Sequence, residues 1–380
     1  MIYADNAATT QLDSDAFEIM KQYLIEDYAN ASQPYSFSRG AKKALKEARI
    51  TIAECIGALP EEIYFTSGGT ESDNWAIKGL MEDRDGKITL TSDIEHHAVL
   101  NACKTLSRLG YPVTYLPVDK QGVVLPETLN KVITDETKLV SIMMANNEIG
   151  TVEPIRELVE ITHAHGALFH TDAVQAVGHI PINVKKLDID MLSASGHKFN
   201  GPKGIGFLYV KKGICINPYA DGGAQEKGMR AGTENVAAIV AMATALKKNC
   251  SFMLEATEKL HSMEKIFIRT LNAAKVDYIR NGGKEHIPGN ISISIKGMNG
   301  EMLLHRLDLK GICISTGSAC DSVNTEISHV IKAIGTPMDY AEGTIRISFG
   351  SRNTVNEAEI IAENIVDIVK KEQENTSYFQ

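Results

Sequence analysis

Short apolar segments alternate with amphipathic ones between about residue 60 and residue 210 of this chain. The apolar segments are rich in residues that favour strands, and those between them repeat apolar residues at helical spacing. This alternation predicts an α/β fold in which helices cover a mostly parallel sheet of seven strands. The predicted strands are 63–65, 88–91, 113–116, 139–144, 167–170, 191–194 and 205–210, and the helices between them include 74–81, 98–109 and 155–165.

The pattern changes toward the C-terminus, where a smaller α+β unit is predicted. Two helices, 14–28 and 41–56, precede the large sheet, and further helices are expected around 235–273. We therefore predict a large domain over 14–252 and a small domain made of 1–13 together with 253–380. The small domain is expected to contain strands 291–295, 312–315 and 344–349 and helices 301–307, 325–334 and 355–371.

Composition and charge narrow the class of protein. The chain has 380 residues, 43% of them hydrophobic and 23% charged, with a net charge of −9. These values are typical of soluble globular proteins and argue against a surface that binds nucleic acid. No apolar run approaches the roughly 20 residues of a membrane span. This absence predicts no membrane partner. The six cysteines form no CxxC pair, so we expect reduced thiols in a cytoplasmic enzyme.

Polar residues follow the predicted strands at the points where the strands end. In open α/β sheets, ligands bind beyond the carboxyl ends of the strands. The polar groups are therefore expected to line one crevice that suits an anionic, aromatic cofactor. They stand at 66–72, 94–97, 146–148, 171–175 and 195–198.

Three of these groups have chemistry that fits such a cofactor. The turn Ser67 to Thr70 could direct backbone N–H groups and hydroxyls at a phosphate, and it matches neither a P-loop nor a dinucleotide fingerprint. Asp172 could keep a pyridine nitrogen protonated, and Lys198 could form a Schiff base. Each of the three has an ordinary alternative. The turn could be a plain tight turn with an N-cap, Asp172 could be a helix cap or a metal ligand beside His170, and Lys198 could be a surface lysine.

The histidines leave a choice between cofactor and metal chemistry. His96 and His97 are adjacent, so one is expected to stack on a ring or shuttle protons while the other is structural. His163 and His165 lie two positions apart in a predicted helix and point to different faces. We therefore expect no metal site.

The predicted small domain contributes two candidate residues. Cys320 stands among small polar residues from Ser315 to Ser322, a composition expected of a mobile loop, and it is either a nucleophile or an incidental thiol. Arg346 interrupts an apolar strand, where an unpaired charge is costly. It should either form a structural ion pair or clamp the α-carboxylate of a substrate.

Taken together, the motifs resemble the NifS/IscS-type cysteine desulfurases, in the class V aminotransferase group of fold-type I enzymes that use pyridoxal 5'-phosphate (PLP). The resemblance runs nearly end to end, and the ordered set is far more specific than any one motif. The motifs are YADNAATT at 3–10, FTSGGTESDN at 65–74, NNEIG at 146–150, DAVQ at 172–175, SGHK at 195–198, RAGTEN at 230–235, GSAC at 317–320 and Arg346.

The resemblance implies a role for each matched residue. Lys198 would hold PLP covalently, with Asp172 on the pyridine nitrogen, Gln175 on the ring oxygen and His96 stacked on the ring. A second group would hold the phosphate: Gly69, Thr70, Ser195 and His197, joined by Thr233 from the other subunit of a homodimer. Asn147 would contact both the cofactor and the substrate, and Arg346 would bind the substrate at its carboxylate.

The resemblance also implies the reaction. Cys320 would take sulfur from L-cysteine as a persulfide, release L-alanine, and pass the sulfur to an acceptor protein such as an iron–sulfur scaffold or a thiolation enzyme. Alternatives on the same scaffold are an aminotransferase, which needs no thiol, and a selenocysteine lyase. A non-enzymatic sulfur-relay scaffold would be expected to lack Lys198 or Asp172, and both are present. A nucleotide-binding protein built around 67–72 would lack the P-loop lysine.

Overall fold

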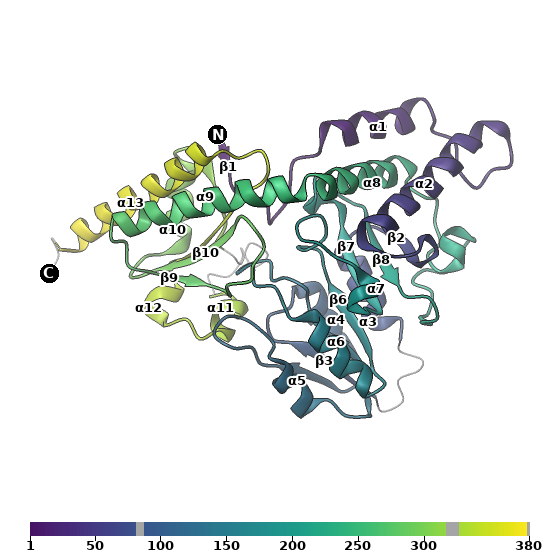
Figure 1. Ribbon diagram of the computed structural model, residues 1–380, viewed down its shortest axis with the longest axis horizontal. Coiled ribbons are helices and arrows are strands. Elements are labelled where there is room, and N and C mark those ends of the chain that lie inside the picture. The colour runs from purple at the N-terminus through teal and green to yellow at the C-terminus, as the bar shows by residue number, and fades with distance from the viewer. Residues whose placement is uncertain (81–86, 317–326, 378–380) are drawn as a thin grey trace.

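The computed structural model describes residues 1–80, 87–316 and 327–377, with side chains up to residue 374. Its centre is a sheet of seven strands in the order β2-β8-β7-β6-β5-β3-β4 (Figure 1). The five strands from β3 to β7 run parallel, and β8 is antiparallel to both β7 and β2. The predicted mostly parallel sheet is confirmed. Its strands are β2 (Ile63–Thr66), β3 (Ile88–Ser92), β4 (Val113–Leu116), β5 (Thr137–Ser141), β6 (Leu168–Asp172), β7 (Met191–Ser195) and β8 (Gly206–Val210).

Helices cover both faces of this sheet. Neighbouring strand residues alternate between the faces, so Phe207 packs with the core under α2, α6 and α8, while Leu208 packs with the core under α3 and α4. The helices of this part are α1 (Ser14–Ile25), α2 (Arg39–Ile56), α3 (Gly69–Lys78), α4 (His97–Arg108), α5 (Pro126–Val132), α6 (Ile155–Ala164), α7 (Val184–Leu187) and α8 (Val236–Ser251).

Among the boundaries that differ from the prediction, two have clear local reasons. Helix α3 begins at Gly69 rather than at residue 74, because Gly68 adopts a φ of +149° that turns the chain directly from β2 into the helix. Strand β5 ends at Ser141 rather than at residue 144. The N–H of Met143 donates to the carboxyl group of Glu95 instead of to a neighbouring strand.

The second unit has its own sheet and its own core. Strands β9, β10 and β12 form an antiparallel sheet in the order β12-β10-β9, and β1 pairs in parallel with β11. Strand β9 was not predicted. Of the predicted helix 325–334, only α11 is observed: it begins at residue 329, because Ser328 caps it and residues 327 and 328 are not helical, while 325 and 326 lie outside the described residues. The elements are β1 (Ile2–Tyr3), α9 (Met253–Ala273), β9 (Tyr278–Asn281), β10 (Asn290–Ile295), α10 (Gly300–Asp308), β11 (Ile312–Cys313), α11 (His329–Ala333), α12 (Met338–Ala341), β12 (Thr344–Ser348) and α13 (Val355–Ser377).

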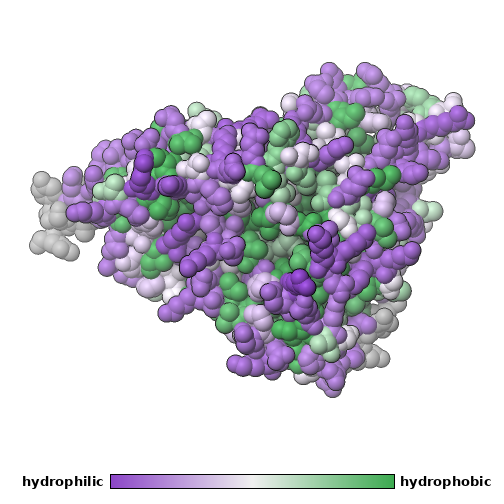
Figure 2. Space-filling view, viewed as in Figure 1, coloured by the Kyte–Doolittle hydropathy of each residue, from purple (hydrophilic) through white to green (hydrophobic). Residues whose placement is uncertain are grey.

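Helices α8 and α9 connect the two units. Their axes are bent by 69° at a break around Phe252, and the buried residues on either side of it belong to different cores (Figure 1). The predicted domain boundary, 252/253, falls at this break and stays a prediction. Hydrophilic side chains cover most of the face seen in Figure 2. Within the described residues, no single helix has the length and apolar character needed to cross a membrane, although α8 and α9 pass that test as a bent pair.

Candidate functional site

A cavity of about 420 Å³ lies where the carboxyl ends of the central strands meet the second unit. It brings together all the predicted site residues except two. Thr233 is exposed and does not line the cavity of its own chain, and Cys320 lies outside the described residues. The predicted residues that line it are Gly69, Thr70, His96, Asn147, Asp172, Gln175, Ser195, His197, Lys198 and Arg346.

One end of the cavity is built for an anion. Gly69 and Thr70 form the first turn of α3, where backbone N–H groups have no partner within the helix. A side chain at Gly69 would come within 2.6 Å of Val174, so glycine keeps this approach open. No side chain caps α3, and the hydroxyl of Ser195 and the imidazole of His197 line the same cavity. The turn does serve as the N-terminal cap of α3, because Gly68 occupies the N-cap position, but no side chain makes the capping hydrogen bond.

A buried carboxylate stands at the end of β6. Asp172 accepts a hydrogen bond from the N–H of Val174 at 2.9 Å, as expected for a local cap, yet it also lines the cavity. Burial raises its pKa to about 6, against the opposing influence of that hydrogen bond and of Lys198. Such a group can accept a hydrogen bond from a protonated ring nitrogen.

The alternative of a metal site formed by Asp172 together with His170 is not supported, because the ring nitrogens of His170 have other partners. His170 is fully buried and bonds through its two ring nitrogens to Ser141 at 2.8 Å and Ser193 at 2.9 Å. Burial lowers the pKa of His170 to about 3, so the ring is neutral. Asp172 does share a cluster with His96 and Asp73, whose possible ligand atoms all lie within 4.8 Å of one another.

Lys198 ends a short 3₁₀ turn, Gly196–Lys198, and faces the N-terminal segment of the chain. Its Nζ donates to the carbonyl oxygens of Ala7 at 2.6 Å and Ala8 at 2.9 Å. The side chain of Gln175 donates to Ala7 as well, at 3.0 Å. The lysine is therefore held inside the cavity, which excludes the surface-lysine alternative. The sequence did not indicate that residues 7 and 8 would close the site.

His96 is held as a neutral ring. Its Nδ1 accepts from the N–H of Ala98 at 3.1 Å, which places the ring proton on Nε2. Burial, together with the charge of Lys198, lowers the pKa of His96 to about 4. His97 lines the cavity as well, as predicted for the group 94–97, and the centroid of its ring lies 5.1 Å from that of His329.

The structural ion pair that was one of the alternatives for Arg346 is present, and its role as a carboxylate clamp stays a prediction. It lies in the middle of β12 with only 2% of its surface exposed. Its Nη2 pairs with the carboxylate of Asp5 at 2.7 Å, and its Nη1 donates to the carbonyl oxygen of Asn147 at 2.9 Å. Its Nε has no hydrogen-bond partner among the described residues, although the side chain lines the cavity. An incoming carboxylate could satisfy this donor.

Sequence reasoning missed several lining residues, Asp73 and His329 among them. Asp73 lies one helical turn after Thr70, so an α3 that begins at Gly69 would have placed it at the site. It is fully buried, and burial and the neighbouring Asp172 raise its pKa. His329 begins α11 and donates to the carbonyl oxygen of Glu95 at 3.0 Å. In the sequence, the position of His329 shortly after the segment that contains Cys320 could have indicated that it lies near the site.

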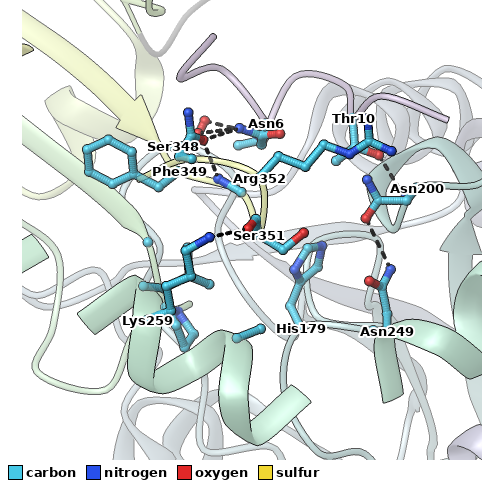
Figure 3. A pocket seen from close by; sticks show the side chains of 18 of the residues that line it. Asn6, Thr10, His179, Asn200, Asn249, Lys259, Ser348, Phe349, Ser351 and Arg352 are labelled. Atoms are coloured by element: carbon cyan, nitrogen blue, oxygen red, sulfur yellow. Dashed lines mark hydrogen bonds between the residues drawn. The ribbon is translucent and has the colours of Figure 1, made fainter. Parts of the chain in front are cut away.

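A second cavity, of about 520 Å³, lies nearby at the junction of the two units. Ala7 and Gln175 line both cavities. Gln175 is the one predicted site residue among the described residues that line this second cavity. Figure 3 shows His179 and Asn249 among the side chains that point into it. His179 contacts the backbone oxygen of Lys198 at 2.8 Å, so the two cavities flank this part of the chain.

Comparison with known proteins decides the family. The model of the class V aminotransferase family matches residues 2–361. This chain belongs to the class V aminotransferase family. It is 46% identical to cysteine desulfurase IscS of Methanosarcina thermophila, over 97% of this chain and 92% of that protein. The cysteine desulfurase IscS of Dictyoglomus turgidum is also 46% identical, over 100% of this chain and 97% of that protein.

Solved structures of the family agree with the fold. A NifS-like protein superposes with a TM-score of 0.91 at 36% identity, over 97% of this chain and 99% of that chain. A NifS-like protein from Rickettsia africae superposes with a TM-score of 0.87 at 32% identity, over 97% and 99% of the two chains. The predicted resemblance to the NifS/IscS-type members of the class V family is confirmed, as is the predicted fold.

Proposed function

We propose that this chain is a PLP-dependent cysteine desulfurase that converts L-cysteine to L-alanine and transfers the sulfur to its own Cys320. The observation that carries this proposal is that one cavity is lined by the N-terminal end of α3, the buried carboxylate of Asp172, Lys198 and the buried Arg346. The names of relatives that match nearly the whole chain support the same reaction.

The donor set fits PLP. The phosphate would bind at the first turn of α3, with Thr70, Ser195 and His197 as side-chain donors. Asp172 would hold the proton of the ring nitrogen, since its carboxylate is buried and faces a cavity rather than a structural cation. Lys198 would exchange its hydrogen bonds to Ala7 and Ala8 for a covalent link to the cofactor.

Substrate binding would use the arginine that the apolar strand holds in place. A cysteine carboxylate would accept from the unpartnered Nε of Arg346, beside Asn147. The ion pair with Asp5 orients Arg346 before the substrate arrives. Asp5 is therefore assigned a positioning role through Arg346.

Proton and sulfur transfer would then divide between three side chains. When bound, PLP supplies an electron-withdrawing ring that takes up electrons from the substrate. Lys198 Nζ would accept and return protons, and His96 would lie against the ring with Nε2–H as a donor. The thiolate of Cys320 would attack the substrate sulfur as the carbon–sulfur bond breaks. The bond's electrons remain with carbon, which is protonated to give alanine.

The remaining assignments extend this proposal to partners. Thr233 is exposed, as expected if it contacts the phosphate of the second subunit in a homodimer. The persulfide would pass to an acceptor protein of iron–sulfur cluster assembly or of a thiolation pathway. We place the enzyme in the cytoplasm, where thiols stay reduced; the cysteines that the structure describes are all free.

Product analysis tests the proposal. Purified protein reconstituted with PLP is incubated with L-cysteine and a reductant, and alanine and sulfide are quantified. Equal amounts of the two products are expected, with none above background from Lys198→Ala. Transfer of an amino group to a keto acid without sulfide release would instead identify an aminotransferase. Activity on selenocysteine alone would identify a selenocysteine lyase.

A further inference from the structure

Three side chains of the kinds that ligate metal ions meet between α9 and the segment that connects β9 to β10. His261 and Glu264 are three positions apart on α9, so their side chains lie on the same face of the helix. His286 comes from the connecting segment. One possible ligand atom from each of the three lies within 4.8 Å of the other two. No metal site was expected from the sequence, because only the fold brings His286 to this helix.

The carboxylate of Glu264 is buried and held in one direction. Its side chain is only 7% exposed, and its Oε1 accepts from the backbone N–H of Gly289. Its Oε2 faces the two histidines, 2.9 Å from Nε2 of His286 and 3.9 Å from Nδ1 of His261. In a tetrahedral zinc site with bonds of about 2.1 Å, ligand atoms lie about 3.4 Å apart. Since the two separations lie on either side of this value, small side-chain movements would place the three atoms around one ion.

The backbone also decides which nitrogen of His286 faces the cluster. Its Nδ1 lies 2.8 Å from the carbonyl oxygen of Lys284, which is only an acceptor, so Nδ1 carries a proton. Histidines that bind a metal commonly donate their other ring N–H to a backbone carbonyl in this way. Its Nε2 therefore faces Glu264, and Nη2 of Arg280 lies 2.9 Å from this nitrogen and 3.2 Å from Oε2 of Glu264. The pair of ligand atoms thus already attracts a cation.

We propose that His261, Glu264 and His286 form a binding site for a divalent transition-metal ion, with zinc as the best match. Two imidazoles and one carboxylate are a common ligand set for zinc. The ion would bind to Nδ1 of His261, Oε2 of Glu264 and Nε2 of His286. A water molecule would take the fourth position, because the side chain of His261 is 53% exposed. Arg280, whose side chain is 37% exposed, would turn out to solvent.

The location gives a bound ion a structural effect. The segment that carries His286 also contacts the large unit through two backbone hydrogen bonds. The N–H of Ile287 donates to Gly150 at 2.9 Å, and the N–H of Val152 donates to Glu285 at 3.0 Å. The ion would therefore tie α9 to a segment that joins the two units. The three ligands are not among the described residues that line the first cavity, so zinc should bind here whether or not PLP is present.

Zinc binding to the purified holoprotein tests the proposal. The protein is treated with a chelator, and its affinity for Zn²⁺ is then measured by equilibrium dialysis. His261→Ala should weaken the tightest site about tenfold or more, because one ligand is lost. His305→Ala, which changes an exposed histidine on α10, is the matched control and should leave the affinity unchanged. Zinc also binds thiols, and the comparison of the variants separates that background from the proposed site.

Arg280→Gln distinguishes a metal site from an ion-pair network. If the cluster binds zinc, this variant lacks a competing cation and should bind Zn²⁺ about threefold or more tightly than wild type. Zinc should also raise the thermal midpoint of wild type and of Arg280→Gln, but not that of His261→Ala. The proposal is overturned if wild type, His261→Ala and Arg280→Gln bind zinc with equal affinity. It is equally overturned if zinc changes the thermal midpoint of wild type and of His261→Ala to the same extent.

Discussion

Glu95 is a carboxyl group that the fold buries completely beside the candidate site. Its Oε1 accepts from the hydroxyl of Ser92 at 2.7 Å and from the N–H of Met143 at 2.9 Å. Its Oε2 has no hydrogen-bond partner among the described residues. Burial raises the pKa of Glu95 to about 8, despite these two hydrogen bonds, and the nearby charge of Asp172 adds to the effect.

The raised pKa makes stability depend on pH with a definite sign. The folded chain keeps a proton on Glu95 up to about pH 8, whereas the unfolded chain loses it near the ordinary value of 4.5. The stability that this proton contributes is complete below the unfolded pKa and is lost as pH rises toward the folded pKa. Glu95→Gln replaces the neutral acid by a neutral amide of similar shape and removes the titration. At about 1.4 kcal/mol per pH unit, wild type should lose about 3 kcal/mol relative to the variant between pH 5.5 and pH 8.5.

Urea unfolding of the holoprotein at fixed protein concentration measures this difference at each pH. The variant should be more stable than wild type by about 1.4 kcal/mol at about pH 5.5, which is one unit above the unfolded pKa, and by about 4–5 kcal/mol at about pH 8.5. Glu258→Gln changes an exposed carboxylate on α9 and serves as the matched control for the loss of a carboxyl group. A difference between Glu95→Gln and wild type that is the same at both pH values would refute this reasoning.

Three further predictions concern single polar contacts. Arg346→Lys should raise the KM for L-cysteine by about 10- to 100-fold while PLP absorbance stays unchanged. The reason is that a lysine cannot bond to Asp5, Asn147 and a substrate carboxylate at the same time. An unaltered KM would contradict the role of Arg346 in binding the carboxylate. Asp172→Asn should weaken PLP binding by about tenfold or more in equilibrium dialysis, because the amide gives the ring-nitrogen proton no charge; equal affinity would rule this out. Arg49→Met should cost about 3–5 kcal/mol in urea unfolding, because Arg49 forms two hydrogen bonds with the buried Glu226, and a loss below about 1 kcal/mol would show that the pair is not needed.

The sequence was most informative where local pattern and topology act together. Apolar runs located each strand of the large sheet, and the parallel order brings the carboxyl ends of neighbouring strands to one edge. Residues that follow different strands, such as His96, Asp172 and Lys198, therefore line one cavity. This much follows from periodicity and from the rule that ligands bind beyond strand ends.

Contacts made across long sequence separations could not be predicted in the same way. No local pattern indicates that Asp5 would pair with Arg346, or that Ala7 would accept from Lys198. Asp73 was missed for a different reason: its place at the site depends on where α3 begins, which Gly68 decides through its backbone conformation. Helix starts that depend on one glycine are poorly marked by hydrophobic periodicity.

The most direct test of the central claim is the mass of the protein after a single turnover. Protein reconstituted with PLP is incubated with L-cysteine in the absence of reductant, digested and mapped by mass spectrometry. The proposed chemistry predicts one added sulfur atom on the peptide that contains Cys320, alanine in equal amount, and neither in Cys320→Ala. Alanine and sulfide formed by Cys320→Ala at the wild-type rate, with no sulfur bound at Cys320 in wild type, would contradict it.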